Sequence, residues 1–74
     1  MKRILVTGAG GTVGLQVIRF LLSEGKYEIT ALDLKNKKVF NRLRKYRKRI
    51  NIVYGDILDR GIIEPLVKES DYII

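Results

Sequence analysis

The stretch "VTGAGGTVG", residues 6–14, places four glycines in nine positions directly behind the apolar run "ILV". A glycine inside a regular element costs about 0.5–1 kcal/mol relative to alanine, so this cluster indicates that the backbone itself contacts something. Gly8, Gly11 and Gly14 are spaced three apart. In that order, they suit a tight turn out of a strand, a close approach of the backbone to a phosphate group, and close packing of a helix.

The residues that follow predict the start of a helix. The amides around Thr12 and Val13 would open it, and unpaired amides at a helix start favour an anion. A strand before the glycines and a helix after them form the context that a dinucleotide-binding loop requires. A Walker A loop is excluded, because Leu15 and Gln16 stand where that motif has Lys and Ser or Thr. The remaining alternative is a glycine-rich structural turn, which leaves the third glycine and the next acidic residue unexplained.

That acidic residue is Asp33, which ends an apolar run 19 residues after Gly14. A dinucleotide fold places a carboxylate here to bind the ribose hydroxyls of adenosine. The same carboxylate repels a 2′-phosphate, so we expect NAD as the cofactor in preference to NADP. Lys35, Lys37 and Lys38 follow closely and could tolerate a 2′-phosphate. Taken alone, Asp33 could also be a solvated loop residue.

A second aspartate lies in "YGDILD", residues 54–59. Asp56 comes just past a predicted third strand, near the place where an adenine would lie. Capping of a turn or a helix explains the residue equally well, and the spacing alone leaves both interpretations open.

The elements that must position these residues alternate along the chain. The patterns predict strands over 3–7, 28–33, 51–54 and 71–74, and helices over 12–24, 37–48 and 62–69. Apolar residues cover most of the first helix, which predicts that it is mostly buried. Gly61 and Pro65 weaken the third helix. The order βαβαβαβ predicts an α/β Rossmann-type parallel sheet with strand order 3-2-1-4, a truncated half of a doubly wound fold.

Composition limits the function further. The chain has 74 residues, enough for one domain, and contains neither cysteine nor histidine. Disulfides, thiolate metal sites and the commonest general base are therefore excluded. No segment resembles a signal peptide or reaches the length of a membrane span, so a cytoplasmic location is expected.

The net charge of +7 comes from one segment, residues 35–49, which holds nine Lys or Arg and no acid. Val39, Leu43, Tyr46 and Ile50 form an apolar stripe beneath it, so Tyr46 is expected to pack on the sheet. Two interpretations stay open: a solvated outer face, or a small basic module that binds nucleic acid through phosphate contacts. A purely structural remnant without a ligand is a third possibility. We expect a dinucleotide partner, no membrane partner and no nucleic acid.

The motifs together resemble the extended short-chain dehydrogenase/reductase family, the NAD-dependent epimerases and dehydratases. "VTGAGGTVG" is similar to its Thr-Gly-x-x-Gly-x-x-Gly pattern, "ALD" to its acidic end of strand two, and "GDILD" to a segment before strand four. The resemblance implies that the loop amides hold the pyrophosphate, Asp33 the ribose, and Asp56 with the Ile57 amide the adenine. The expected cofactor-binding residues are Gly8, Gly11, Thr12, Val13, Gly14, Asp33, Leu34, Asp56 and Ile57, with no catalytic or metal-binding residue.

The Tyr-x-x-x-Lys pair that carries this family's chemistry is absent. Ala31, Ile50 and Leu58 stand four residues after Tyr27, Tyr46 and Tyr54, and Tyr72 lies two residues from the end. The chain thus resembles an N-terminal cofactor-binding portion without a substrate domain, and we expect no redox chemistry from it alone. The apolar strand "DYII" has no expected partner on its outer edge, which predicts self-association.

Overall fold

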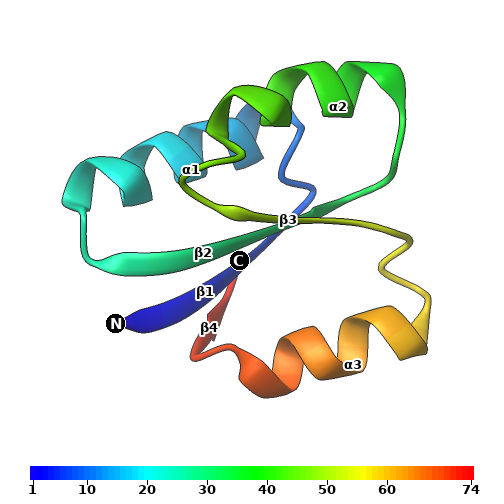
Figure 1. The fold of residues 1–74 in the computed structure, drawn as a ribbon. Coiled ribbons are helices and arrows are strands. Elements are labelled where there is room, and N and C mark those ends of the chain that lie inside the picture. The colour runs from blue at the N-terminus through cyan, green and yellow to red at the C-terminus, as the bar shows by residue number, and fades with distance from the viewer.

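The computed structural model describes residues 1–74 and contains a four-stranded parallel sheet in the order β3-β2-β1-β4 (Figure 1). This order confirms the expected Rossmann-type topology. The elements along the chain are β1 Lys2–Thr7, α1 Thr12–Glu24, β2 Tyr27–Asp33, α2 Lys37–Leu43, β3 Asn51–Tyr54, α3 Arg60–Glu69 and β4 Tyr72–Ile73.

Helices lie on both faces of the sheet, with α1 and α2 on one face and α3 on the other (Figure 1). The main core lies between the first two helices and the sheet, where Ile4, Val6, Ile18, Ile29 and Leu43 are buried together. Leu5 and Leu32 are fully buried as well. They alternate with the core residues along their strands and therefore point to the α3 face. None of the three helices has the length and apolar character needed to cross a membrane.

Helix α1 has the bounds that the sequence predicts. It begins after Gly11 and ends at Gly25, whose φ of 69° is the left-handed conformation that glycine adopts readily. The expectation that α1 is mostly buried was wrong, because Val13 is 73% exposed and Phe20 63% exposed. Only the side of the helix that faces the sheet and α2 is covered.

Helix α2 is shorter than predicted. It ends at Leu43 instead of continuing to residue 48, and a 3₁₀ turn over Arg44–Tyr46 follows. The basic segment explains the early end, because like charges four residues apart destabilise a helix and no acidic side chain compensates them. The Tyr46 carbonyl accepts the amides of Arg49 and Ile50, which turns the chain into β3. Tyr46 packs against the core as predicted.

Helix α3 begins at Arg60, two residues before the predicted start. The Asp59 side chain caps it by accepting the Gly61 amide at 3.0 Å, and Arg60 pairs with Glu64 at 3.1 Å. These interactions support a first turn that Gly61 weakens, and the helix continues past Pro65 to Glu69.

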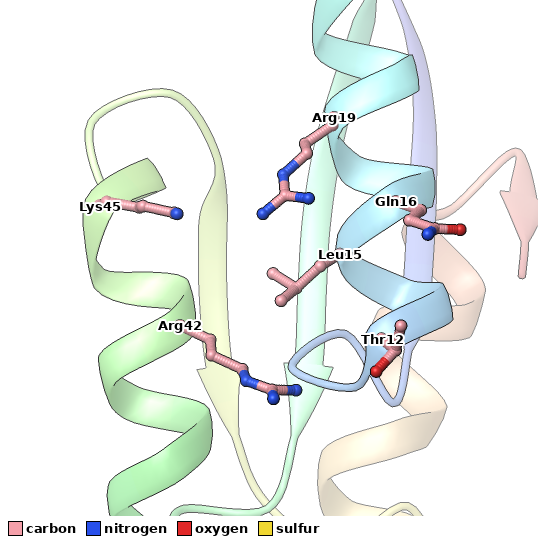
Figure 2. A pocket seen from close by; sticks show the side chains of 6 residues that line it. All are labelled: Thr12, Leu15, Gln16, Arg19, Arg42 and Lys45. Atoms are coloured by element: carbon pink, nitrogen blue, oxygen red, sulfur yellow. The ribbon is translucent and has the colours of Figure 1, made fainter.

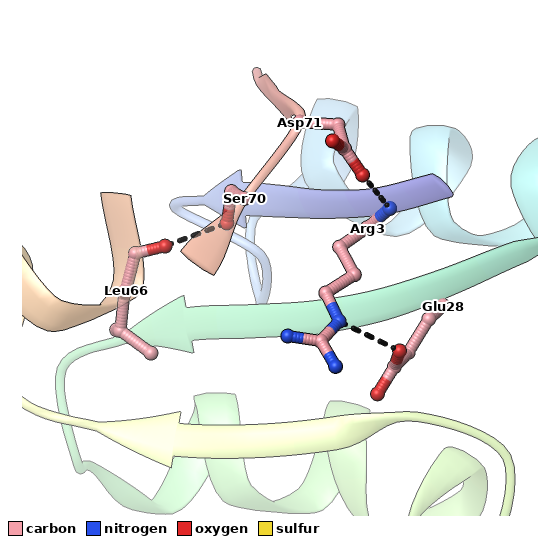
Figure 3. Close-up of polar contacts among 5 residues, drawn as sticks. All are labelled: Arg3, Glu28, Leu66, Ser70 and Asp71. Atoms are coloured by element: carbon pink, nitrogen blue, oxygen red, sulfur yellow. Dashed lines mark hydrogen bonds and ion pairs between the residues drawn. The ribbon is translucent and has the colours of Figure 1, made fainter. Parts of the chain in front are cut away.

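The end of α3 is tied to the sheet by polar contacts around β1 (Figure 3). Asp71 accepts the Arg3 amide at 2.8 Å through its carboxylate, and its own amide donates to the Arg3 carbonyl at 2.8 Å. The Arg3 side chain pairs with Glu28 of β2 at 3.1 Å. Ser70 donates its hydroxyl to the Leu66 carbonyl at 2.7 Å. These contacts set β4 beside β1 at one edge of the sheet.

Candidate functional site

The loop between β1 and α1 is held in a shape that requires glycine at two positions. Gly8 has a φ of 61°, which strains any residue with a side chain. A Cβ at Gly14 would lie 2.4 Å from the Gly8 carbonyl oxygen and 2.8 Å from the Ala9 Cα. Both neighbours are backbone atoms, so Gly14 allows the first turn of α1 to pack directly on the loop.

The start of α1 leaves amides unpaired. The N-cap residue is Gly11, which has no side chain to accept a hydrogen bond. The amides of Thr12, Val13 and Gly14 donate to no group in the chain. Unpaired amides together with the positive end of the helix dipole form a site for an anion.

Asp33 connects the end of β2 to this loop. Its Oδ2 atom accepts the Gly10 amide at 2.8 Å, and its Oδ1 atom accepts the Leu34 amide at 2.7 Å. A carboxylate has about four acceptor positions, so each oxygen keeps a lone pair for a hydroxyl donor. The two backbone bonds therefore fix the carboxylate without using up its capacity to bind a ligand.

A pocket of about 220 Å³ opens at the carboxyl ends of β1, β2 and β3. In an open α/β sheet, this edge is where ligands bind. Its lining residues are Thr7, Gly8, Leu32, Asp33, Leu34, Gly55, Asp56 and Ile57. Leu34 is 53% exposed and Ile57 51% exposed, which gives the pocket two apolar side chains available to a ligand. Five of the nine residues expected from the sequence thus meet in one pocket, while the other four lie at the start of α1.

Asp56 performs the turn-capping role that the sequence left open. Its Oδ1 atom accepts the Leu58 amide at 2.9 Å, and its carbonyl accepts the Asp59 amide at 2.9 Å. The same side chain lines the pocket. Capping of the turn accordingly places this carboxylate beside Ile57 at the pocket wall.

Two residues at the site were missed from the sequence, Gly10 and Arg42. The Gly10 amide bonds to Asp33, and its carbonyl accepts Nη1 of Arg42 at 3.1 Å. A Cβ at Gly10 would lie 2.8 Å from a methyl group of Val39, so α2 packs directly on this residue. Gly10 is the fourth glycine of the loop and lies outside the three-residue spacing of Gly8, Gly11 and Gly14. This extra glycine was the signal in the sequence that could have pointed to its contacts.

Comparison with known proteins identifies the family of the chain. The sequence model that describes the NAD dependent epimerase/dehydratase family matches residues 4–74. The chain belongs to this family. It is 36% identical to dTDP-glucose 4,6-dehydratase of Mycolicibacterium smegmatis over 74 residues, which are 97% of this chain and 22% of that enzyme.

Solved structures have the same fold. The PbgP3 protein from Burkholderia pseudomallei superposes with a TM-score of 0.82 at 27% identity, over 97% of this chain and 21% of that one. UDP-glucuronic acid 4-epimerase from Bacillus cereus, solved with UDP-glucuronic acid and NAD, superposes with a TM-score of 0.81 at 23% identity, over 97% and 25%. The chain therefore spans between a fifth and a quarter of the length of these three proteins.

The cofactor of this family is a nicotinamide dinucleotide, and the residues of the site fit such a group. The unpaired amides at the start of α1 suit a pyrophosphate. The fixed carboxylate of Asp33 has acceptor capacity left for hydroxyl groups.

Proposed function

We propose that residues 1–74 bind the adenosine half of NAD in an NAD-dependent epimerase/dehydratase-like oxidoreductase acting on nucleotide sugars or related substrates. Membership of the family supports the cofactor class. The substrate class is supported by the names of relatives, among them a dTDP-glucose dehydratase and a UDP-glucuronic acid epimerase.

The observation that carries the proposal is the bond between the Gly10 amide and Asp33 Oδ2 at 2.8 Å. It joins the glycine loop to the end of β2, so one carboxylate lies beside both the start of α1 and the pocket. A ligand that places a ribose at Asp33 would therefore have its phosphates beside the loop. This order of groups is that of an adenosine diphosphate.

In this proposal each part of the site has a separate role. Gly8, Gly11 and Gly14 shape the loop, and the amides of Thr12 and Val13 bind the pyrophosphate. Asp33 and Leu34 hold the ribose. Asp56 and Ile57 flank the adenine. When bound, NAD would accept a hydride at its nicotinamide ring in the oxidised form and donate one in the reduced form. The sequence contains no Tyr-x-x-x-Lys pair, so we expect these residues to bind the cofactor without turning over a substrate.

We propose NAD over NADP because Asp33 would repel a 2′-phosphate. The lysines that follow, at positions 35, 37 and 38, are exposed and take part in no ion pair, so they could offset part of that repulsion. Parallel calorimetric titrations with NAD and NADP test the preference. Tighter binding of NAD supports the assignment, and equal or tighter binding of NADP contradicts it.

The test of the whole site is a titration of the ¹⁵N-labelled chain with ADP, followed through its amide signals. Shifts should gather at residues 8–14, 33–34 and 55–57. A second titration with duplex DNA examines the basic segment. Shifts confined to residues 35–49, seen with DNA and absent with ADP, would contradict a cofactor site and favour a nucleic-acid-binding module. No response to either ligand would favour a structural remnant.

We also propose that the chain on its own associates through β4. This strand pairs only with β1, and Tyr72, Ile73 and Ile74 are each more than half exposed. An exposed apolar edge strand is a template for pairing with another chain. Analytical ultracentrifugation at micromolar concentration should show dimers or larger species that Tyr72→Lys reduces. A monodisperse parent chain would contradict the idea.

A further inference from the structure

A second polar pocket lies between α1 and α2, on the outer side of these helices (Figure 2). Its volume is about 280 Å³. The lining residues are Thr12, Leu15, Gln16, Arg19, Arg42 and Lys45. Three of the six are cations: Arg19 of α1, Arg42 of α2 and Lys45 of the 3₁₀ turn that follows α2. None of the six is acidic. The buried Leu15 side chain forms the only apolar part.

Two of these cations are each held in position by one hydrogen bond that the guanidinium group donates. Arg19 donates from Nε to the Tyr46 hydroxyl at 3.0 Å, and Arg42 donates from Nη1 to the Gly10 carbonyl at 3.1 Å. Each guanidinium keeps further N–H groups that bond to nothing in the chain. Figure 2 shows the side chains of Arg19, Arg42 and Lys45 reaching into the space between the two helices.

No carboxylate neutralises this cluster. The two ion pairs of the chain are Arg3–Glu28 and Arg60–Glu64, and both lie elsewhere. Asp33, which bonds to the amide of Gly10, engages the backbone through both carboxylate oxygens. Three like charges that line one pocket repel one another, and an anion placed among them would relieve that repulsion.

We propose that this α1–α2 pocket binds a compact phosphate-bearing anion, such as pyrophosphate or a phosphate monoester, through Arg19, Arg42 and Lys45. Planar guanidinium groups match phosphate oxygens in geometry and charge, and hydrogen bonds between charged groups are the stronger ones. The pocket adjoins the cofactor site through Thr12 and through the bond of Arg42 to the Gly10 carbonyl. Arg19 and Lys45 lie outside the residues proposed for the cofactor and make the pocket a separate site.

A compact anion fits the cluster better than a nucleic acid does. Two of the neighbouring basic side chains make other contacts: Arg44 lies over the Phe40 ring at 5.8 Å, and Arg47 donates to the Arg44 carbonyl at 2.8 Å. Within the pocket, Lys45 lies over the Tyr46 ring at 5.5 Å. Arg19, Arg42 and Lys45 are the cations that line one pocket, where a single compact anion could contact all three.

The experiment is calorimetric titration of the chain with inorganic pyrophosphate, comparing two double variants that remove the same charge. Arg19→Gln/Lys45→Gln changes the pocket and leaves the contact of Arg42 with the glycine loop intact. Arg44→Gln/Lys48→Gln changes exposed residues of the same basic segment outside the pocket. Circular dichroism establishes that both variants fold. The first double variant should weaken pyrophosphate binding by about tenfold or more, and the second by less than about twofold.

A third variant separates this site from the cofactor site. Gly11→Val obstructs the start of α1 and so removes any pyrophosphate bound at the glycine loop. The part of the binding that Arg19→Gln/Lys45→Gln removes should stay within about twofold of the parent, since the charge-assisted bonds of the pocket remain. Loss of binding in this variant would place the anion on the glycine loop and overturn the proposal. Absence of pyrophosphate binding, or equal weakening by the two double variants, would also overturn it. Duplex DNA binding that both double variants weaken equally, without pyrophosphate binding, would assign the charge to a diffuse nucleic-acid surface.

Discussion

The three helices of this chain begin in two different ways. Helices α2 and α3 each begin behind a polar residue, Asn36 or Asp59, whose side chain accepts a backbone amide of the first turn at 2.9 or 3.0 Å. Helix α1 begins behind Gly11 and has no such acceptor. It is nevertheless the longest of the three and carries three of the residues in the main core.

The difference shows which helix start is structural and which is available to a ligand. A side-chain cap stabilises a helix by about 1 kcal/mol relative to alanine but by only a few tenths of a kcal/mol relative to glycine, so Gly11 begins α1 at a small cost. At α1 the packing of Gly14 on Gly8 and Ala9 fixes the start instead, and the first amides of the helix stay unpaired. Capped starts therefore hold the fold together, and the uncapped start can hold an anion.

The largest expected effect is that of Gly14→Ala. The new Cβ would lie 2.4 Å from the Gly8 carbonyl oxygen, and a backbone atom in a short loop cannot easily move away. We expect the free energy of unfolding to fall by about 3 kcal/mol, at the upper end of typical overpacking costs. Urea unfolding followed by circular dichroism measures this. Val13→Ala, at an exposed neighbour, should change stability by less than about 0.5 kcal/mol, and equal losses would contradict the packing role of Gly14.

Gly11→Val should have its main effect on binding. A Cβ here approaches only the Gly8 carbonyl oxygen, at 3.3 Å, so the chain should still fold. The branched side chain would occupy the space in front of the amides, and binding of NAD and ADP should become undetectable by calorimetry. Thr12→Val is the matched control, because it removes a hydroxyl and keeps the amide. Parental affinity in Gly11→Val, or lost affinity in Thr12→Val, would show that the amides are not the phosphate site.

Asp33→Ala should weaken NAD and ADP to the same extent, by about 1–3 kcal/mol, because a charge-assisted hydrogen bond to ribose is lost in both. The control is Asp59→Ala, which removes the same charge and also a bond to a backbone amide, but at α3. Calorimetry on the two variants separates a local contact from a general effect of charge. The ribose role would fail if both variants weakened ADP equally.

The smallest effect is expected for Asp59→Ala itself, measured as stability. Loss of the cap should lower the free energy of unfolding by about 1 kcal/mol. ADP affinity should not change, because the cap is structural. A clear change in ADP affinity with unaltered stability would reverse the distinction between capped and uncapped helix starts.

Much of the fold could be predicted because local signals agree with the tertiary arrangement. Glycines bound α1 on both sides, and the apolar stripe through Val39 and Leu43 matches the buried face of α2. The length of α2 could not be predicted in this way. Its stripe continues to Ile50, whereas repulsion within the basic segment and the turn into β3 end the helix at Leu43. The exposure of Phe20 was also missed, because an apolar surface does not reveal whether a neighbouring element covers it.

At the site, the spacing of the glycines and of Asp33 predicted residues that the structure brings together. Gly10 and Arg42 escaped prediction because their contacts depend on how α2 lies against the loop. No local pattern encodes the bond between Arg42 and the Gly10 carbonyl, which joins residues 32 positions apart.

The central claim is that these residues hold the adenosine half of a dinucleotide, and a calorimetric comparison of NAD with ADP tests it most directly. Both ligands carry the adenine, the ribose joined to it and the phosphates that the loop and Asp33 would bind. We expect the two dissociation constants to be similar and no tighter than roughly 0.1 mM, about −5.5 kcal/mol of binding free energy. NAD binding much more tightly than ADP, or neither ligand binding, would contradict the account.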